Sequence, residues 1–322
     1  MNCIDLISFV ILILKYQKMV KFPSEFSQRL ARIVPPGLQH QVRLGFATQK
    51  PTTFRINLLK SSAEKVLKEM EEGGVKCETA FSIPNAYLVK KGSAKKIHGL
   101  TCYREGGVYL QSLSSQIPVL VLDPKPGERI LDMAAAPGGK TCQIAAMMGN
   151  VGEIIAVEPE KIRFEKLKFN LERQGVKNIQ TLNIRGEKLE ESFVGSFDRI
   201  LLDAPCSSEG TFCLTDPRSF AHWSLEWVRK IAELQKKLII VAASLLKPGG
   251  HLVYSTCALS LEENEEVVHF ALQQFPELTL IDIPLKFPFL KPAFSPIVKA
   301  RRIYPSETME GFFVCLLKRK SA

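Results

Sequence analysis

The sequence predicts an α/β fold, a doubly wound Rossmann-like sheet preceded by a small α+β N-terminal domain. Strand and helix patterns alternate from residue 108 onward, which is typical of a parallel sheet covered on both faces. At 130–141 a strand runs into a glycine turn and then a helix, an arrangement that holds nucleotide-like ligands. A chain of 322 residues allows about two domains. We therefore expect an N-terminal domain over 21–107 and a second domain over 108–322.

Residues 1–20 form an apolar extension whose most hydrophobic run is 6–14. As a helix this run would span only about 13 Å, less than half of the roughly 30 Å hydrocarbon core of a bilayer. Asp5 lies where a signal peptide carries positive charge, and no small-residue cleavage site follows. We expect neither an anchor nor a signal peptide. A translation start at Met19 explains the extension best, and a short interfacial helix is the alternative.

The N-terminal domain is expected to begin with a strand at 52–58. Ser61 should begin a helix, because Glu64 follows at the spacing of a capping box. The glycine pair at 73–74 ends this helix, and a further strand is expected at 87–91. These alternating elements predict a small α+β module.

Six strands and four helices are expected in the second domain. The strands are placed at 129–133, 153–158, 178–183, 197–203, 251–255 and 312–317. The helices are placed at 140–148, 160–174, 225–246 and 261–274. The turn Lys-Pro-Gly-Gly at 247–250 should end the third helix and lead into the fifth strand.

The composition is that of an ordinary globular chain, with 46% hydrophobic and 24% charged residues. A formal net charge of +10 favours a polyanionic partner, either nucleic acid or an anionic membrane. One local basic cluster consists of Lys90, Lys91, Lys95 and Lys96. This cluster either contacts phosphates or is a solvated surface, and the sequence leaves both interpretations open.

Eight cysteines are present, without a Cys-x-x-Cys pair or a close Cys/His cluster of zinc-ligand spacing. This pattern favours a reduced, cytoplasmic setting over a disulfide framework, and we expect no metal site. Two of the cysteines, Cys206 and Cys257, each follow a predicted strand. Their position on loops at the edge of a sheet suggests nucleophile chemistry rather than burial as small apolar side chains.

Open α/β sheets bind ligands beyond the carboxyl ends of their strands, so the loops after strands one, two, four and five should converge on one crevice. The turn Pro137-Gly138-Gly139 would let the backbone approach a ligand without Cβ clashes. Glu158, at the end of the second strand, can accept hydrogen bonds from ribose hydroxyls. A cofactor that contains a nucleoside is therefore expected.

Four sequence motifs resemble, in their order along the chain, the motifs of the Sun/NOP2-type RNA (cytosine-5)-methyltransferases, which use S-adenosylmethionine. They lie at 132–141, 203–207, 254–257 and 310–313, and the likeness extends over about 22–320, including the segments 51–57 and 111–116. The resemblance implies that 21–107 contacts RNA and that 108–322 is the methyltransferase domain. It also implies that Cys257 is the nucleophile and that Cys206 assists release of the methylated RNA.

The resemblance further implies a set of cofactor contacts. The methionine end of S-adenosylmethionine would lie along Ala134, Ala135, Ala136, Pro137, Gly138, Gly139 and Lys140, with Glu158 on the ribose. Asp203 would lie beside both cofactor and target base, and Lys140 and Asp203 would contact the cytosine. Where relatives carry an acidic residue near the adenine, this chain has Arg185. Either Arg185 or Glu187, two positions further on, takes the adenine side.

The chemistry follows from the residues themselves, because C5 of cytosine must be activated before it can accept a methyl group. A thiolate that adds to C6 achieves this, and Asp203 at N3 would stabilise the adduct. An ordinary cysteine is only about 3% thiolate at pH 7, a handicap of roughly 2 kcal/mol that a nearby Lys140 ammonium would reduce.

Two other interpretations stay open. In one, Cys206 is the nucleophile, because DNA cytosine-5 methyltransferases attack from a Pro-Cys segment. In the other, the chain is a non-catalytic RNA-binding assembly factor. Ribosomal RNA is the expected substrate and transfer RNA the alternative. We expect a monomer without a membrane partner, in which RNA is gripped by the N-terminal part and the rim of the cleft, because no further domain follows 313–320.

Overall fold

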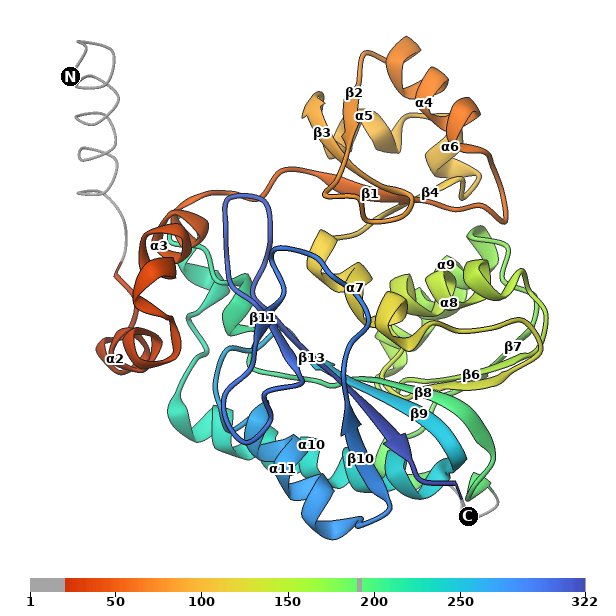
Figure 1. The fold of residues 1–322 in the computed structure, drawn as a ribbon. Helices are drawn as coiled ribbons and strands as arrows, with labels where there is room; N and C mark the ends of the chain where they lie inside the picture. Colours follow the sequence, from red (N-terminus) through yellow and green to blue (C-terminus); the bar gives the residue numbers. More distant parts are fainter. Residues whose placement is uncertain (1–20, 190–192, 322) are drawn as a thin grey trace.

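The computed structural model describes residues 21–189 and 193–321. The predicted extension at 1–20, with the expected start at Met19, lies outside them. Within the described ranges the strands form two sheets, a four-stranded antiparallel sheet and a nine-stranded mixed sheet (Figure 1). The predicted architecture, a doubly wound sheet preceded by a small α+β module, is confirmed.

The large sheet has the strand order β11-β12-β13-β9-β8-β5-β6-β7, with β10 paired to β13. Its central strands run parallel, namely β5 (Arg129–Asp132), β6 (Glu153–Val157), β7 (Ile179–Leu182), β8 (Phe197–Asp203) and β9 (Leu246–Thr256). The chain winds outward from β5 to β7 and then returns to the other side of β5 with β8. This reversal creates the switch point at which open α/β sheets bind ligands.

The far edge of this sheet is antiparallel, which the sequence did not predict. β13 (Phe312–Arg319) pairs antiparallel with β9. It is flanked by β10 (Leu278–Ile281) and β12 (Arg301–Ile303), and β11 (Lys291–Pro292) follows β12. The expected parallel sheet is therefore corrected to a mixed one.

Helices cover both faces of the large sheet (Figure 1). They are α7 (Leu113–Leu122), α8 (Gly139–Met148), α9 (Lys161–Arg173), α10 (Leu225–Leu245) and α11 (Glu265–Gln274). One core joins Leu131, Ile155 and Leu202 of the strands to α10 and α11. The alternate strand residues Ile130 and Ile154 pack with α7 and α8 on the opposite face. The period-2 alternation of buried side chains is what holds the three layers together.

The small sheet has the order β2-β3-β1-β4. Its elements are β1 (Thr53–Ile56), α4 (Ala63–Glu72), β2 (Lys76–Thr79), β3 (Ala86–Lys91), α5 (Ala94–His98), α6 (Thr101–Arg104) and β4 (Val108–Leu110). Phe54, Val66 and Ile97 form its core. β4 lies beyond residue 107, and the domain boundary placed there stays a prediction.

Two helices before the small sheet pack elsewhere. α2 (Ser24–Ile33) and α3 (Gln39–Ala47) contribute Phe26 and Phe46 to a core that also contains Phe212 and Trp223, from the segment between β8 and α10. By packing, these two helices therefore belong with the large sheet (Figure 1).

Several element boundaries differ from the prediction, and three of them are informative. Ser62 rather than Ser61 caps α4, because its hydroxyl accepts the Lys65 N–H at 3.3 Å. β9 already begins at Leu246, and the predicted turn at 247–250 forms an irregularity within its pairing with β8. α11 begins at Glu265 instead of 261, since Asn264 is held in a non-helical conformation. In the described ranges, no helix combines the length and apolar character needed to cross a bilayer.

Candidate active site

A cavity of about 810 Å³ opens at the carboxyl ends of β5, β6 and β8, where the topology predicts a ligand site. Its wall includes the predicted site residues Ala134, Ala136, Glu158, Arg185, Asp203, Cys206 and Cys257. The remaining predicted residues, which do not line the cavity themselves, are Ala135, Pro137, Gly138, Gly139 and Lys140. One cavity thus combines the predicted cofactor side and both thiols.

The glycine turn supports the cavity from behind. Gly138 has φ +105°, and a Cβ there would come within 3.1 Å of Leu167 on α9. A Cβ on Gly139 would come within 3.0 Å of the Tyr109 ring. These glycines therefore allow the turn to pack closely against the protein itself, and its contact with a ligand stays a prediction.

Glu158 is almost fully buried at the cavity wall, at 1% exposure. Its Oε1 accepts the Glu160 N–H at 3.0 Å. Its Oε2 lies 3.5 Å from the Arg163 guanidinium and has no other partner among the described residues. One carboxylate oxygen therefore remains available to a hydroxyl donor in the cavity, as the sequence predicts.

Arg185 and Glu187 both line the cavity. The Arg185 side chain is 69% exposed, whereas the Glu187 side chain is only 25% exposed, and their charged groups lie 3.9 Å apart. The more enclosed position of Glu187 suits a directed contact better than the solvated Arg185. Both remain candidates for the adenine side.

Asp203 ends β8 and is held from two directions. Its Oδ2 accepts from the Lys140 ammonium at 2.5 Å, and its Oδ1 accepts from the Ser255 hydroxyl at 2.7 Å. Lys140 also donates to Ser115 Oγ at 2.7 Å and lies 5.6 Å from the centre of the Phe312 ring. The predicted pair Lys140 and Asp203 is therefore a fixed ion pair at the cavity edge.

The sulfur atoms of Cys206 and Cys257 lie 3.0 Å apart. This proximity follows from the sheet, because the register of β8 with β9 places Asp203 opposite Ser255, just before the two cysteine loops. The hydrogen bond with Cys257, together with burial, raises the pKa of the Cys206 thiol well above its ordinary value. A raised pKa favours the protonated form of Cys206, whose S–H lies within hydrogen-bond distance of the Cys257 sulfur.

Buried carboxylates hold the loops that carry these thiols. Glu263 accepts from the Ser207 N–H at 2.8 Å and the Ser260 hydroxyl at 2.8 Å, and burial raises its pKa to about 7. Glu209 accepts the N–H groups of Leu259 and Ser260 at 3.0 and 2.7 Å. Together they connect the Cys206 loop to the Cys257 loop.

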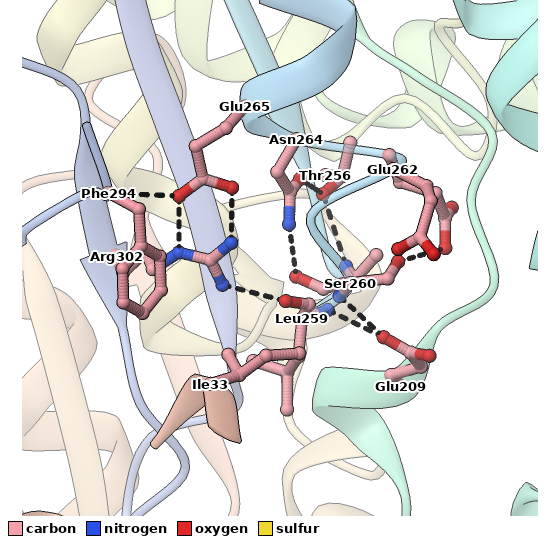
Figure 2. A network of polar contacts seen from close by, with 12 residues as sticks. Ile33, Glu209, Thr256, Leu259, Ser260, Glu262, Asn264, Glu265, Phe294 and Arg302 are labelled. Atoms are coloured by element: carbon pink, nitrogen blue, oxygen red, sulfur yellow. Dashed lines mark hydrogen bonds and ion pairs between the residues drawn. The ribbon is translucent and has the colours of Figure 1, made fainter. Parts of the chain in front are cut away.

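Figure 2 shows how the segment after Cys257 is anchored from the other side. The fully buried Arg302 pairs with Glu265 and donates to the Leu259 carbonyl at 2.7 Å. Leu259 therefore has its N–H fixed by Glu209 and its carbonyl fixed by Arg302. Asn264 adds a bond from its amide to the Ala258 carbonyl at 3.1 Å.

Two glycines fix the backbone of Cys257. The Gly210 N–H donates to the Cys257 carbonyl at 2.8 Å, and the Gly311 N–H donates to the Gly210 carbonyl at 2.8 Å. A Cβ on Gly210 would lie 2.2 Å from the Gly311 oxygen, so only glycine fits there. The motif at 310–313 thus reaches the site through its backbone.

Sequence reasoning missed the supporting residues Ser115, Ser255, Glu209, Glu263, Glu265 and Arg302. Ser115 and Ser255 lie within the segments 111–116 and 254–257, but nothing in the sequence distinguishes these serines from others. The acidic residues resemble surface residues in the sequence, and only the tertiary structure reveals their burial. Across 21–189 and 193–321, no group of three or more His, Cys, Asp or Glu side chains is placed to hold a metal ion.

Comparisons with known proteins agree with this geometry. The sequence profile of the family described as "16S rRNA methyltransferase RsmB/F" matches residues 119–318. The chain is 36% identical over 84% of its length to the 25S rRNA (cytosine-C(5))-methyltransferase nop2 of Schizosaccharomyces pombe. It is 35% identical over 93% of its length to the ribosomal RNA small subunit methyltransferase F of Pectobacterium carotovorum. It spans 46% and 63% of the lengths of these two relatives.

Solved structures show the same fold over almost the whole chain. A methyltransferase homolog protein from Pyrococcus horikoshii aligns with a TM-score of 0.76 at 31% identity, covering 92% of this chain and 100% of that one. NSun6 from the same organism, solved with SFG, aligns with a TM-score of 0.81 at 25% identity, covering 94% and 99%. The fold and cavity are thus those of a methyltransferase superfamily. Within it, the chain belongs to the RsmB/F family.

Proposed function

We propose that this chain is an S-adenosylmethionine-dependent RNA (cytosine-5)-methyltransferase that acts on ribosomal RNA. The observation that carries the proposal is the 3.0 Å contact between the Cys206 and Cys257 sulfurs at the rim of one cavity with Asp203 and Glu158. Ribosomal RNA is favoured over transfer RNA because the two curated relatives are named as rRNA methyltransferases.

The residues of the cavity fit S-adenosylmethionine. The free oxygen of Glu158 suits a ribose hydroxyl, and the small side chains of Ala134 and Ala136 leave room for the methionine portion. Arg185 or Glu187 takes the adenine side. When bound, this cofactor supplies an electrophilic methyl group.

Cys257 is the nucleophile in this proposal. Its sulfur adds to C6 of the cytosine while Cys206 remains a thiol, because the proton stays with the group of raised pKa. Lys140 and Asp203 face the N3 side of the base, where the Lys140 ammonium stabilises the negative charge that develops, and Ser255 fixes the orientation of the Asp203 carboxylate. Addition at C6 makes C5 nucleophilic, so C5 can take the methyl group.

Release requires the C5 proton to leave and the C6–S bond to break. Cys206 is placed for both transfers. It gives its proton to the departing Cys257 sulfur at 3.0 Å, and as a thiolate it then takes the C5 proton. Cys206 thereby regains its proton and the aromatic ring is restored, while Cys257 ends as a thiol and loses one proton to solvent before it attacks again.

The test is methyl transfer followed by location of the product. The full chain is incubated with tritiated S-adenosylmethionine and total RNA, and ribosomal and transfer RNA are separated before counting. Bisulfite sequencing of RNA from a deletion strain then identifies the cytosine. Label in ribosomal RNA is expected. Label only in transfer RNA would reassign the substrate, and unchanged cytosine methylation in every RNA would reject the enzymatic proposal in favour of an assembly factor.

A further inference from the structure

A second groove, of about 540 Å³, lies apart from the methyltransferase cavity. We name it the aromatic groove. Four parts of the chain line it, and the lining residues used in the argument are Leu44, Phe81, Phe289, Lys291, Tyr304 and Met309. Leu44 belongs to α3, Phe81 to the loop between β2 and β3, Lys291 to β11, and the rest to C-terminal loops (Figure 1). The groove therefore joins the small sheet to the large one.

Phe81 combines an exposed aromatic ring with an unfavourable backbone conformation. Phe81 is 49% exposed, and its ring packs edge-to-face against the ring of Phe289, with ring centres 5.8 Å apart. Its φ is +49°, and Ser82 and Asn85 in the same loop have φ +60°. A bulky residue pays roughly 1 to 2 kcal/mol in this left-handed region. A strained loop that presents an exposed aromatic ring points to a function.

One short segment of the chain connects the lining of the groove with the active site. Tyr304 and Met309 line the groove, and two residues after Met309 the Gly311 N–H bonds the Gly210 carbonyl beside Cys257. The next residue, Phe312, places its ring against the Lys140 ammonium. The segment 304–312 therefore contributes both to the groove and to the contacts beside Cys257 and Lys140.

We propose that the aromatic groove binds single-stranded RNA next to the target cytosine, with a base stacked on Phe81 and a phosphate paired with Lys291. This rests on the proposed function for the class of partner. Exposed aromatic rings stack on bases of any sequence, and lysine neutralises the backbone. The exposed His40 adds a second potential cation, while Glu307 is the one acid in the lining. The whole-chain charge of +10 matches a polyanion.

The test measures binding of a labelled single-stranded RNA of about 12 nucleotides to the full chain by fluorescence anisotropy. Phe81→Ala should weaken binding by about 5- to 150-fold, because one stacked base is lost. Phe81→Tyr should keep wild-type affinity, since the ring remains. The matched control is Phe169→Ala, which removes another exposed aromatic ring, 63% exposed, on α9. Lys291→Ala should lower the slope of log affinity against log salt by about 0.7.

Unchanged affinity of Phe81→Ala, or an equal loss in Phe169→Ala, overturns the proposal. So does a concentration-dependent dimer of the wild type that Phe81→Ala abolishes, because it would assign the groove to a second copy of the chain. The measurement needs neither cofactor nor turnover. Its failure is therefore distinct from failure of the proposed function, in which RNA would bind through Phe81 without becoming methylated.

Discussion

The buried ion pair of Arg302 with Glu265 should stabilise the fold and position the nucleophile. The side chains of these residues are 1% and 6% exposed. In Arg302→Met the Glu265 carboxylate stays buried without its partner, and the Leu259 carbonyl loses its donor. Breaking a buried pair in this way costs about 3 to 5 kcal/mol. Guanidinium unfolding of the single variant should report a loss of that size.

The double variant Arg302→Met with Glu265→Leu separates the effect of the buried charge from that of the hydrogen bond to the Leu259 carbonyl. It removes both charges and should recover most of the lost stability, because no buried charge remains unpaired. It still lacks the bond to the Leu259 carbonyl, worth about 1 kcal/mol or more when the acceptor is buried. Methyl transfer should therefore stay low in kcat, with KM unchanged, in both variants. A single variant as stable as wild type, or a double variant less stable than the single one, would refute this reasoning.

Three further predictions concern the cavity and its support. The stability of wild type relative to Glu263→Gln should be greatest below pH about 4.5 and fall as pH rises through about 7, because the folded state holds a proton on Glu263. The measurement is the free energy of unfolding of both proteins at several pH values. A difference in stability that stays constant with pH would contradict this prediction. Glu158→Gln should weaken S-adenosylmethionine binding by about 1.5 to 3 kcal/mol in calorimetry, and unaltered affinity would exclude its ribose contact. Gly138→Ala should lose both cofactor affinity and roughly 1 to 2 kcal/mol of stability, whereas Gly127→Ala, at φ +87° in open space, should lose stability alone.

The sequence predicts the parallel strands well because each is a short run with a clear pattern between turn signals. β8 has the predicted bounds of 197–203. The short antiparallel strands β10, β11 and β12 were missed, since elements of two to four residues leave almost no periodic signal. The start of α11 was placed too early because leucine and glutamate at 261–263 are good helix formers, whereas the bonds of Asn264 to Thr256 and Ala258 accompany a non-helical conformation there.

The topology of the sheet predicts that the site residues lie close together, but it does not predict their distances or protonation states. Loops after adjacent parallel strands meet at one edge, so Cys206 and Cys257 were expected near each other. Nothing in the sequence indicates which sulfur keeps the proton. That assignment depends on a 3.0 Å contact and on the burial of Cys206. The role of the glycine turn was likewise beyond the sequence, because the neighbours of Gly138 come from α9.

The most direct test of the account separates the two thiols by their place in the reaction. Each cysteine is changed to serine, and the variants are incubated with S-adenosylmethionine and unmodified substrate RNA before electrophoresis under denaturing conditions. Cys257→Ser should give neither product nor adduct, because a serine hydroxyl is almost wholly protonated at neutral pH. Cys206→Ser should attack normally and stall before release, so that a denaturation-resistant protein–RNA adduct accumulates. An adduct in Cys257→Ser and none in Cys206→Ser would contradict the account and make Cys206 the nucleophile.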